Sequence, residues 1–150
     1  MHSFVLARPD VSFEWRMDEQ EKTSYPKCLN ENDFKERICA LFKINSLNHL
    51  IEIKTEYEDK NLSLYFPLNI SSKARAQQFL IINKRPIQDK KIISLIAKTI
   101  QTKYHLFDAP HFVLYLNIPA NQIDINVHPT KSMVKFHQNA KILGFILSSI

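Results

Sequence analysis

The sequence predicts an α+β fold, a mixed β-sheet with interspersed helices packed mainly on one face. Short runs in both halves of the chain alternate between apolar and polar residues, which is the period of half-buried strands. Other stretches place isoleucine and leucine at helical spacing. The chain has 150 residues, 45% hydrophobic and 23% charged, which is enough to bury one core. We therefore expect a single domain.

The first third of the chain predicts a helix, a strand and a second helix. Residues 3–7 resemble the end of a helix that Pro9 stops, and we expect residues 1–8 to be the tail of a linking helix in a longer protein. Residues 11–15 alternate as a strand, and residues 18–26 form a loop or the end of a hairpin. A helix over residues 34–43 follows, capped by Asn32 or Asp33.

The middle of the chain predicts paired strands and one long helix. Residues 50–57 and 62–68 alternate around the turn 58–61, which indicates an antiparallel pair. The apolar, β-branched run 78–83 predicts a central strand. Asp89 then caps a helix to about Tyr104, with isoleucines at helical spacing. We expect further strands at 112–118, 123–127 and 133–137, and a final helix from about Asn139.

Residues 124–136, DINVHPTKSMVKF, interrupt a strand pattern at one point. Pro129 cannot donate to a sheet ladder and pushes His128 toward extended geometry, so pairing ends there and Thr130 and Lys131 leave the sheet edge. A lysine in that place suits a terminal phosphate, since it is a compact charge with three donors. By this geometry alone, we favour the alternative that Lys131 is a turn lysine in water.

Positive charge is concentrated in the middle of the chain. The net charge is +5, and residues 70–105 hold eight lysines or arginines against Asp89, which makes that segment +7 and the remainder −2. Such a segment suits a polyanion, because each cation near a phosphate releases a counterion. The alternative is a solvated helix face.

Several function classes are excluded by composition. Gly144 is the single glycine, so no glycine-built phosphate cradle can be present, and any nucleotide contact must come from side chains that assist a site built elsewhere. Cys28 and Cys39 are too far apart for a CxxC pair, and the six histidines show no metal-ligand spacing. No apolar run approaches the ~20 residues of a membrane span, so we expect no membrane partner.

Several segments together resemble the MutL family of DNA mismatch repair proteins. DINVHPTKSMVKFH is similar to the family's DVNVHPxKxEVRF segment, QQFLIINKRPIQDKK resembles its QYFFVNGRxVRD segment, and HSFVLARPDVSF resembles ALAHPDVSF. The resemblance is strong over residues 77–137 and weak over residues 17–70. It implies the transducer domain, of ribosomal protein S5 domain 2-like fold, that follows a GHKL-type ATPase domain.

The resemblance also implies site residues. Lys131 matches the family lysine that reaches the ATP γ-phosphate, and Lys90 matches a basic residue implicated in DNA binding. Asn126, His128, Pro129 and Thr130 would shape the turn around Lys131. The other candidate DNA-binding residues are Arg85, Lys84, Lys91, Lys73 and Arg75.

Three positions depart from the family pattern. The glycine of the NGR turn is Lys84, the acidic residue two after the tip lysine is Met133, and Lys91 replaces a usually apolar residue. Lys84 requires that the turn differ or tolerate strain, since glycine reaches positive φ without cost. The changes at positions 84 and 91 add positive charge to the expected DNA-binding surface.

The resemblance implies a part of an enzyme, with no catalytic residue of its own. ATP, with Mg²⁺, would be bound mainly by the ATPase domain, and the partners would be DNA, a MutS-type mismatch recognition protein, and a second copy or a paralogue as dimer partner. The compartment would be the cytoplasm in a bacterium and the nucleus in a eukaryote. Two alternatives remain: the transducer domain of another GHKL ATPase, such as a type II topoisomerase B subunit, and a stand-alone nucleic-acid-binding module of S5 type.

Overall fold

The computed structural model describes residues 2–16, 18, 21–68, 75–125, 134–136 and 139–150. In chain order the helices are α1 (His2–Ala7), α2 (Glu31–Phe42), α3 (Lys90–Lys103) and α4 (Asn139–Ser149). The strands are β1 (Phe13–Trp15), β2 (Thr23–Tyr25), β3 (Leu50–Tyr57), β4 (Lys60–Pro67), β5 (Gln78–Ile82), β6 (Arg85–Ile87), β7 (Phe112–Asn117), β8 (Ile123–Ile125) and β9 (Val134–Phe136). Short 3-10 helices span Leu47–His49 and Ala120–Gln122.

A five-stranded mixed sheet in the order β3-β4-β7-β5-β6 forms the centre of the fold. Among the described strands, only the β5–β7 pair is parallel, because α3 and the loop after it carry the chain back to the starting end of the sheet. Two further pairs, β1–β2 and β8–β9, are antiparallel and form separate two-stranded sheets. The α+β class predicted from the sequence is confirmed.

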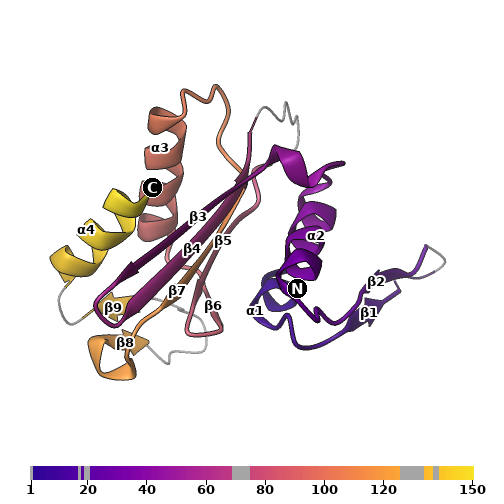
Figure 1. The fold of residues 1–150 in the computed structure, drawn as a ribbon, viewed down its shortest axis with the longest axis horizontal. Helices are drawn as coiled ribbons and strands as arrows, with labels where there is room; N and C mark the ends of the chain where they lie inside the picture. The colour runs from indigo at the N-terminus through magenta and orange to yellow at the C-terminus, as the bar shows by residue number, and fades with distance from the viewer. Residues whose placement is uncertain (1, 17, 19–20, 69–74, 126–133, 137–138) are drawn as a thin grey trace.

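The helices divide between the two faces of the central sheet, so the expectation that they pack mainly on one face is wrong (Figure 1). Helices α3 and α4 bury Leu64, Leu80 and Leu114 on one face. Helices α1 and α2 cover the other face, which presents Ile81 and Val113. The physical reason is that β4, β5 and β7 carry large side chains on both sides, and each side must be shielded from water.

Local boundaries also differ from those predicted. Asn30, and neither Asn32 nor Asp33, caps α2, because its side chain accepts a hydrogen bond from the Asp33 N–H. Residues 23–25 pair with β1, so the expected loop or hairpin end is a hairpin. Asp89 caps α3 as predicted, accepting from the N–H groups of Lys91 and Ile92 at 3.1 and 3.3 Å.

The predicted central strand over residues 78–83 ends one residue earlier, at Ile82, and β7 occupies the middle of the sheet. The edge strand β6 was not predicted. It contains Pro86, whose missing N–H is tolerated at a sheet edge. No helix among the described residues is long and apolar enough to cross a membrane.

Candidate nucleotide and nucleic-acid site

Three segments meet at one end of the central sheet: the β3–β4 turn, the β5–β6 turn and the chain that leaves β7. The register explains the meeting, because Asn61 of β4 pairs with Asn117 of β7, and Ile82 of β5 pairs with Leu116. The pair β8–β9 lies at the same end (Figure 1). We refer to this region as the turn end of the sheet. Two of the candidate DNA-binding residues, Lys84 and Arg85, lie in the β5–β6 turn and at the start of β6.

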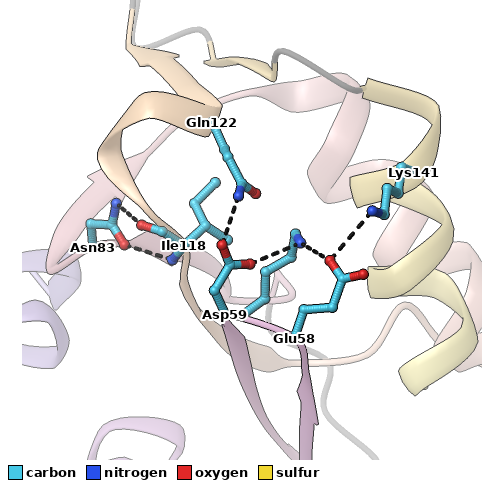
Figure 2. Close-up of polar contacts among 7 residues, drawn as sticks. Glu58, Asp59, Asn83, Ile118, Gln122 and Lys141 are labelled. Atoms are coloured by element: carbon cyan, nitrogen blue, oxygen red, sulfur yellow. Dashed lines mark hydrogen bonds and ion pairs between the residues drawn. The ribbon is translucent and has the colours of Figure 1, made fainter.

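The β5–β6 turn is fastened to the end of β7 by one residue, Asn83. Its side-chain amide donates to the Ile118 carbonyl at 2.9 Å, and its side-chain oxygen accepts from the Ile118 N–H at 2.9 Å (Figure 2). Its backbone N–H donates to the Leu116 carbonyl at 2.9 Å. Both turn residues have positive φ, 50° at Asn83 and 64° at Lys84, as a two-residue type I′ hairpin turn requires.

The β3–β4 turn holds a buried lysine between two carboxylates. Lys60 is 3% exposed and donates to Asp59 Oδ1 at 3.2 Å and Glu58 Oε2 at 3.5 Å, with its Nζ 5.8 Å from the centre of the Tyr57 ring. Burial alone would lower the pKa of the Lys60 amine, but the hydrogen bond from Lys60 to Asp59 and both negative charges raise it. Lys60 is therefore a charged, fully partnered group.

The same two carboxylates tie the turn to elements on either side of β8–β9. Gln122, directly before β8, donates to Asp59 Oδ2 at 2.9 Å, and Lys141 of α4 donates to Glu58 Oε2 at 3.3 Å (Figure 2). Hydrogen bonding to Lys60 lowers the pKa of Asp59, and hydrogen bonding to Lys141 lowers the pKa of Glu58. The carboxylates stay ionised and keep these ties at neutral pH.

The structure places the basic candidates on exposed positions of two neighbouring elements. Lys84 and Arg85 are exposed at the β5–β6 turn and the start of β6, and Lys90 and Lys91 are exposed in the first turn of α3. Arg75 is exposed ahead of β5, toward the opposite end of the sheet. The four residues at positions 84, 85, 90 and 91 thus lie within eight residues of one another around β6.

Lys84 differs from the other cations in its surroundings. It borders a cleft of about 480 Å³ between α1, the N-terminus of α2 and the sheet, together with Asp10, Tyr65 and Tyr115. Burial raises the pKa of the Tyr65 phenol to about 12 and raises that of Tyr115 as well, so both remain neutral hydroxyls. Lys84 therefore faces the α1–α2 side of the sheet, whereas Lys90 and Lys91 begin the helix on the other side.

The residues predicted to contact ATP lie outside the described residues: Asn126, His128, Pro129, Thr130 and Lys131, as does the basic candidate Lys73. Their flanks are described. Strand β8 pairs with β9 in the register Ile123↔Phe136 and Ile125↔Val134, so the chain on either side of positions 126–133 is held together. Ile123 and Phe136 are buried in the core shared with α3 and α4.

The part of the chain that the structure describes offers little to bind a nucleotide by itself. Gly144, the single glycine, lies in α4, and no group of three or more His, Cys, Asp or Glu among the described residues could hold a metal ion.

The polar ties at the turn end were not predicted from the sequence. Asn83 and Ile118 are 35 residues apart, and Gln122 is 63 residues from Asp59. A local signal existed for Asn83 alone, since asparagine is one of the few residues that favour positive φ in a hairpin turn.

Comparison of the sequence with known proteins identifies a family. The family model described as "DNA mismatch repair protein, C-terminal domain" matches residues 38–150. The DNA mismatch repair protein MutL of Buchnera aphidicola is 30% identical over 148 residues, which are 97% of this chain and 25% of that protein. MutL of Klebsiella pneumoniae is 28% identical over 148 residues, 97% of this chain and 24% of that protein. The chain thus spans about a quarter of the length of these curated relatives.

Solved structures share the fold at low sequence identity. The ATPase domain of the mismatch repair endonuclease MutL of Aquifex aeolicus aligns with a TM-score of 0.63 and 20% identity, over 98% of this chain and 47% of that one. The N-terminal domain of a DNA repair protein aligns with a TM-score of 0.68 and 18% identity, over 98% and 49% of the two chains. The B subunit of DNA gyrase of Myxococcus xanthus aligns with a TM-score of 0.52 and 8% identity, over 97% and 45%.

Proposed function

Because the chain belongs to the MutL family of DNA mismatch repair proteins, we propose that residues 1–150 form a single transducer domain that follows a GHKL-type ATPase domain. In this role the domain binds DNA through a basic surface and contributes one lysine to ATP. It couples the nucleotide state to closure of a dimer. The domain is one part of an ATPase and carries no catalytic residue of its own.

Lys131 is the proposed contact to the γ-phosphate. The observation that carries the proposal is the β8–β9 pair, which joins both flanks of residues 126–133 at the turn end of the sheet. A primary amine there supplies a point charge and up to three donors to a phosphate held by the preceding domain. ATP and Mg²⁺ would supply the phosphoryl chemistry, while this chain presents the charge that distinguishes a bound γ-phosphate from its absence.

The proposed DNA surface consists of the cations around β6. Lys84, Arg85, Lys90 and Lys91 are exposed, and none of them forms a salt bridge with another residue that the structure describes, so their charges are available to phosphates. Lys90 is central to the proposal because it begins α3 on a helix that Asp89 fixes in place. Lys73 and Arg75, which precede β5, would extend the surface along the strand.

The test uses the full-length protein with Lys131→Ala and Lys90→Ala. We expect Lys131→Ala to lower ATP binding or turnover by about ten-fold, as loss of a charged hydrogen bond of about 1.4 kcal/mol implies. Lys90→Ala should weaken DNA binding and reduce the slope of log affinity against log salt by about one unit. Lys27→Ala, at an exposed residue next to β2 and far from the turn end, serves as a matched control for both measurements.

The outcomes separate the candidates. Unchanged turnover in Lys131→Ala would contradict the ATP contact, and if Lys90→Ala still weakened DNA binding, a nucleic-acid module of S5 type would be the better description. Binding to DNA that is indifferent to ATP would point the same way. The family match to mismatch repair proteins disfavours a topoisomerase-type transducer, with which the chain shares only the fold, as the gyrase B alignment at 8% identity indicates.

The partners follow from the same proposal. A MutL-type protein would meet a MutS-type mismatch recognition protein and would dimerise with a second copy or a paralogue through its N-terminal region. We place the protein in the bacterial cytoplasm, because the curated MutL relatives named above come from bacteria. Sedimentation of the full-length protein with and without a non-hydrolysable ATP analogue tests whether closure of the dimer depends on nucleotide.

A further inference from the structure

We propose that Asn83 is a positioning residue that links the basic β5–β6 turn to the β8–β9 pair, so that DNA bound at the turn alters ATP turnover. The inference rests on the proposed function, because it assumes that DNA contacts the turn and that residues between β8 and β9 act on ATP. It assigns a role to Asn83, which is uncharged and is not among the proposed phosphate contacts.

The contact consists of two hydrogen bonds between the Asn83 side chain and the Ile118 main chain. One amide side chain engages both polar groups of the Ile118 main chain, at 2.9 Å each, while the backbone of the same residue is bonded to Leu116. A movement of the turn therefore cannot leave the chain after β7 in place without breaking hydrogen bonds. Lys84 and Arg85, the exposed cations of the turn, follow Asn83 directly in sequence.

The far side of the contact leads to β8 by a short route. Ile118 is 6% exposed and Ile123, the first residue of β8, is 7% exposed, and both belong to the same core cluster. Only Pro119 and the 3-10 helix Ala120–Gln122 separate them. A buried residue at each end transmits a displacement, since neither can rotate freely in a packed core.

The pair β8–β9 forms no ladder with the five-stranded sheet among the described strands, so its placement depends on side chains. Gln122, directly before β8, and Lys141, in α4, bond to the carboxylates of the β3–β4 turn, and Asn83 attaches the chain that leads to β8 to the β5–β6 turn. Figure 2 shows these ties together, at the end of the sheet. Only the Asn83 tie comes from a turn that carries exposed cations.

Asparagine suits this task for two reasons. Its amide provides a donor and an acceptor together, and it tolerates the φ of 50° that the turn requires. Asn83 is itself exposed, so water competes for its hydrogen bonds. The link is therefore weak enough for a bound polyanion to shift it, which a buried tie would resist.

The experiment measures ATP turnover of the full-length protein with and without DNA, using single-stranded DNA as the probe. Asn83→Gly keeps a residue that reaches positive φ and removes the contact to Ile118. We expect basal turnover and DNA affinity to stay within about two-fold, while stimulation by DNA falls about five-fold, the effect expected from losing a partly exposed pair of hydrogen bonds. Asn83→Asp keeps the turn and the bond from the Ile118 N–H but opposes a carboxylate to the Ile118 carbonyl, so it should lose stimulation as well.

A double-mutant cycle with Arg85→Ala tests the coupling directly. If Asn83 relays what Arg85 senses, the double variant should lose no more stimulation than the larger of the two single losses. Losses that multiply would overturn the inference, as would full stimulation in both Asn83 variants or a parent protein that DNA does not stimulate.

Failure of the proposed function would give a different result from failure of the coupling role. Normal turnover in Lys131→Ala contradicts the ATP contact itself. Impaired turnover in Lys131→Ala together with full stimulation in the Asn83 variants overturns the coupling role alone.

Discussion

Removing the Arg37 guanidinium should destabilise the fold more than any other single change of a charged residue among those the structure describes. Arg37 lies in α2, is 4% exposed, and donates to four main-chain carbonyls. The distances are 2.8 Å to Val5, 3.1 Å to Arg8 and 2.9 Å to Val11, and Pro26 is the fourth acceptor. One side chain thereby joins the end of α1 to the residues just before β1 and just after β2.

The magnitude follows from what the acceptors would lose. The last carbonyls of a helix have no partner within the helix, so the Val5 carbonyl depends on Arg37, whereas the Arg8 carbonyl, just after α1, also accepts from the Val11 N–H at 3.2 Å. A hydrogen bond to a charged group contributes about 1.5–3 kcal/mol, and removing one side of a buried charged network costs about 3–5 kcal/mol in total. The Arg37 Nε is buried without a partner, which offsets part of the gain. We therefore expect Arg37→Met to lower the free energy of unfolding by about 3–4 kcal/mol.

Urea denaturation followed by tryptophan fluorescence is the appropriate assay, because Trp15 is the only tryptophan in the chain and lies in β1, beside the contact. Arg37→Lys should fall between parent and Arg37→Met, since one ammonium cannot span acceptors that a planar guanidinium reaches. Arg8→Ala removes an exposed pair with Asp10 and should leave the midpoint unchanged. A loss below about 1 kcal/mol for Arg37→Met would refute the reasoning.

Three further predictions concern the core, one turn and pH. Lys84→Gly should stabilise the fold by about 0.5–1 kcal/mol in the same assay, because glycine reaches the φ of 64° without a steric cost. Ile96→Ala, at a fully buried position of α3, should cost about 2–5 kcal/mol, measured as a drop in the urea midpoint. Burial lowers the pKa of His111 below its ordinary 6.5, and the His111 Nδ1 accepts from the Gln77 N–H at 2.9 Å, so the folded chain prefers neutral imidazole. Neutral His111 contributes its full stabilisation of the fold above about pH 6.5. This stabilisation is lost as the pH falls from that value toward the lower pKa of the folded state, because the unfolded chain then binds the proton more readily. His111→Gln should therefore reduce the dependence of the melting temperature on pH between pH 7 and 5.

The sequence was sufficient to predict the elements whose signal is local. Helix α3 combines a capping Asp89 with isoleucines at helical spacing, and both features act within one helix. The division of helices between two faces also has a local signal in the sequence. Residues 112–116, FVLYL, and 78–82, QFLII, are nearly continuous apolar runs, which indicate strands buried on both sides.

The ties at the turn end lay beyond sequence reasoning for a physical reason. Asn83 finds Ile118, and Asp59 finds Gln122, only after β5, β7 and β4 have paired in the right register. Each residue is an ordinary polar residue in a turn when considered alone. The clustering of the basic residues can be predicted from the sequence alone. Residues that are close along the chain stay close in space when they share one hairpin and the helix after it.

The separation of the structure into three hydrogen-bonded sheets has a consequence for its slow internal motions. Backbone amides of β4 and β7, inside the five-stranded sheet, can exchange with solvent deuterium only when a large part of the core opens. The short β8–β9 ladder can unzip without breaking any bond of that sheet among the described strands. Its amides should therefore exchange through a smaller, more frequent opening. Strands β8 and β9 can thus be remodelled on their own timescale while the five-stranded sheet stays folded.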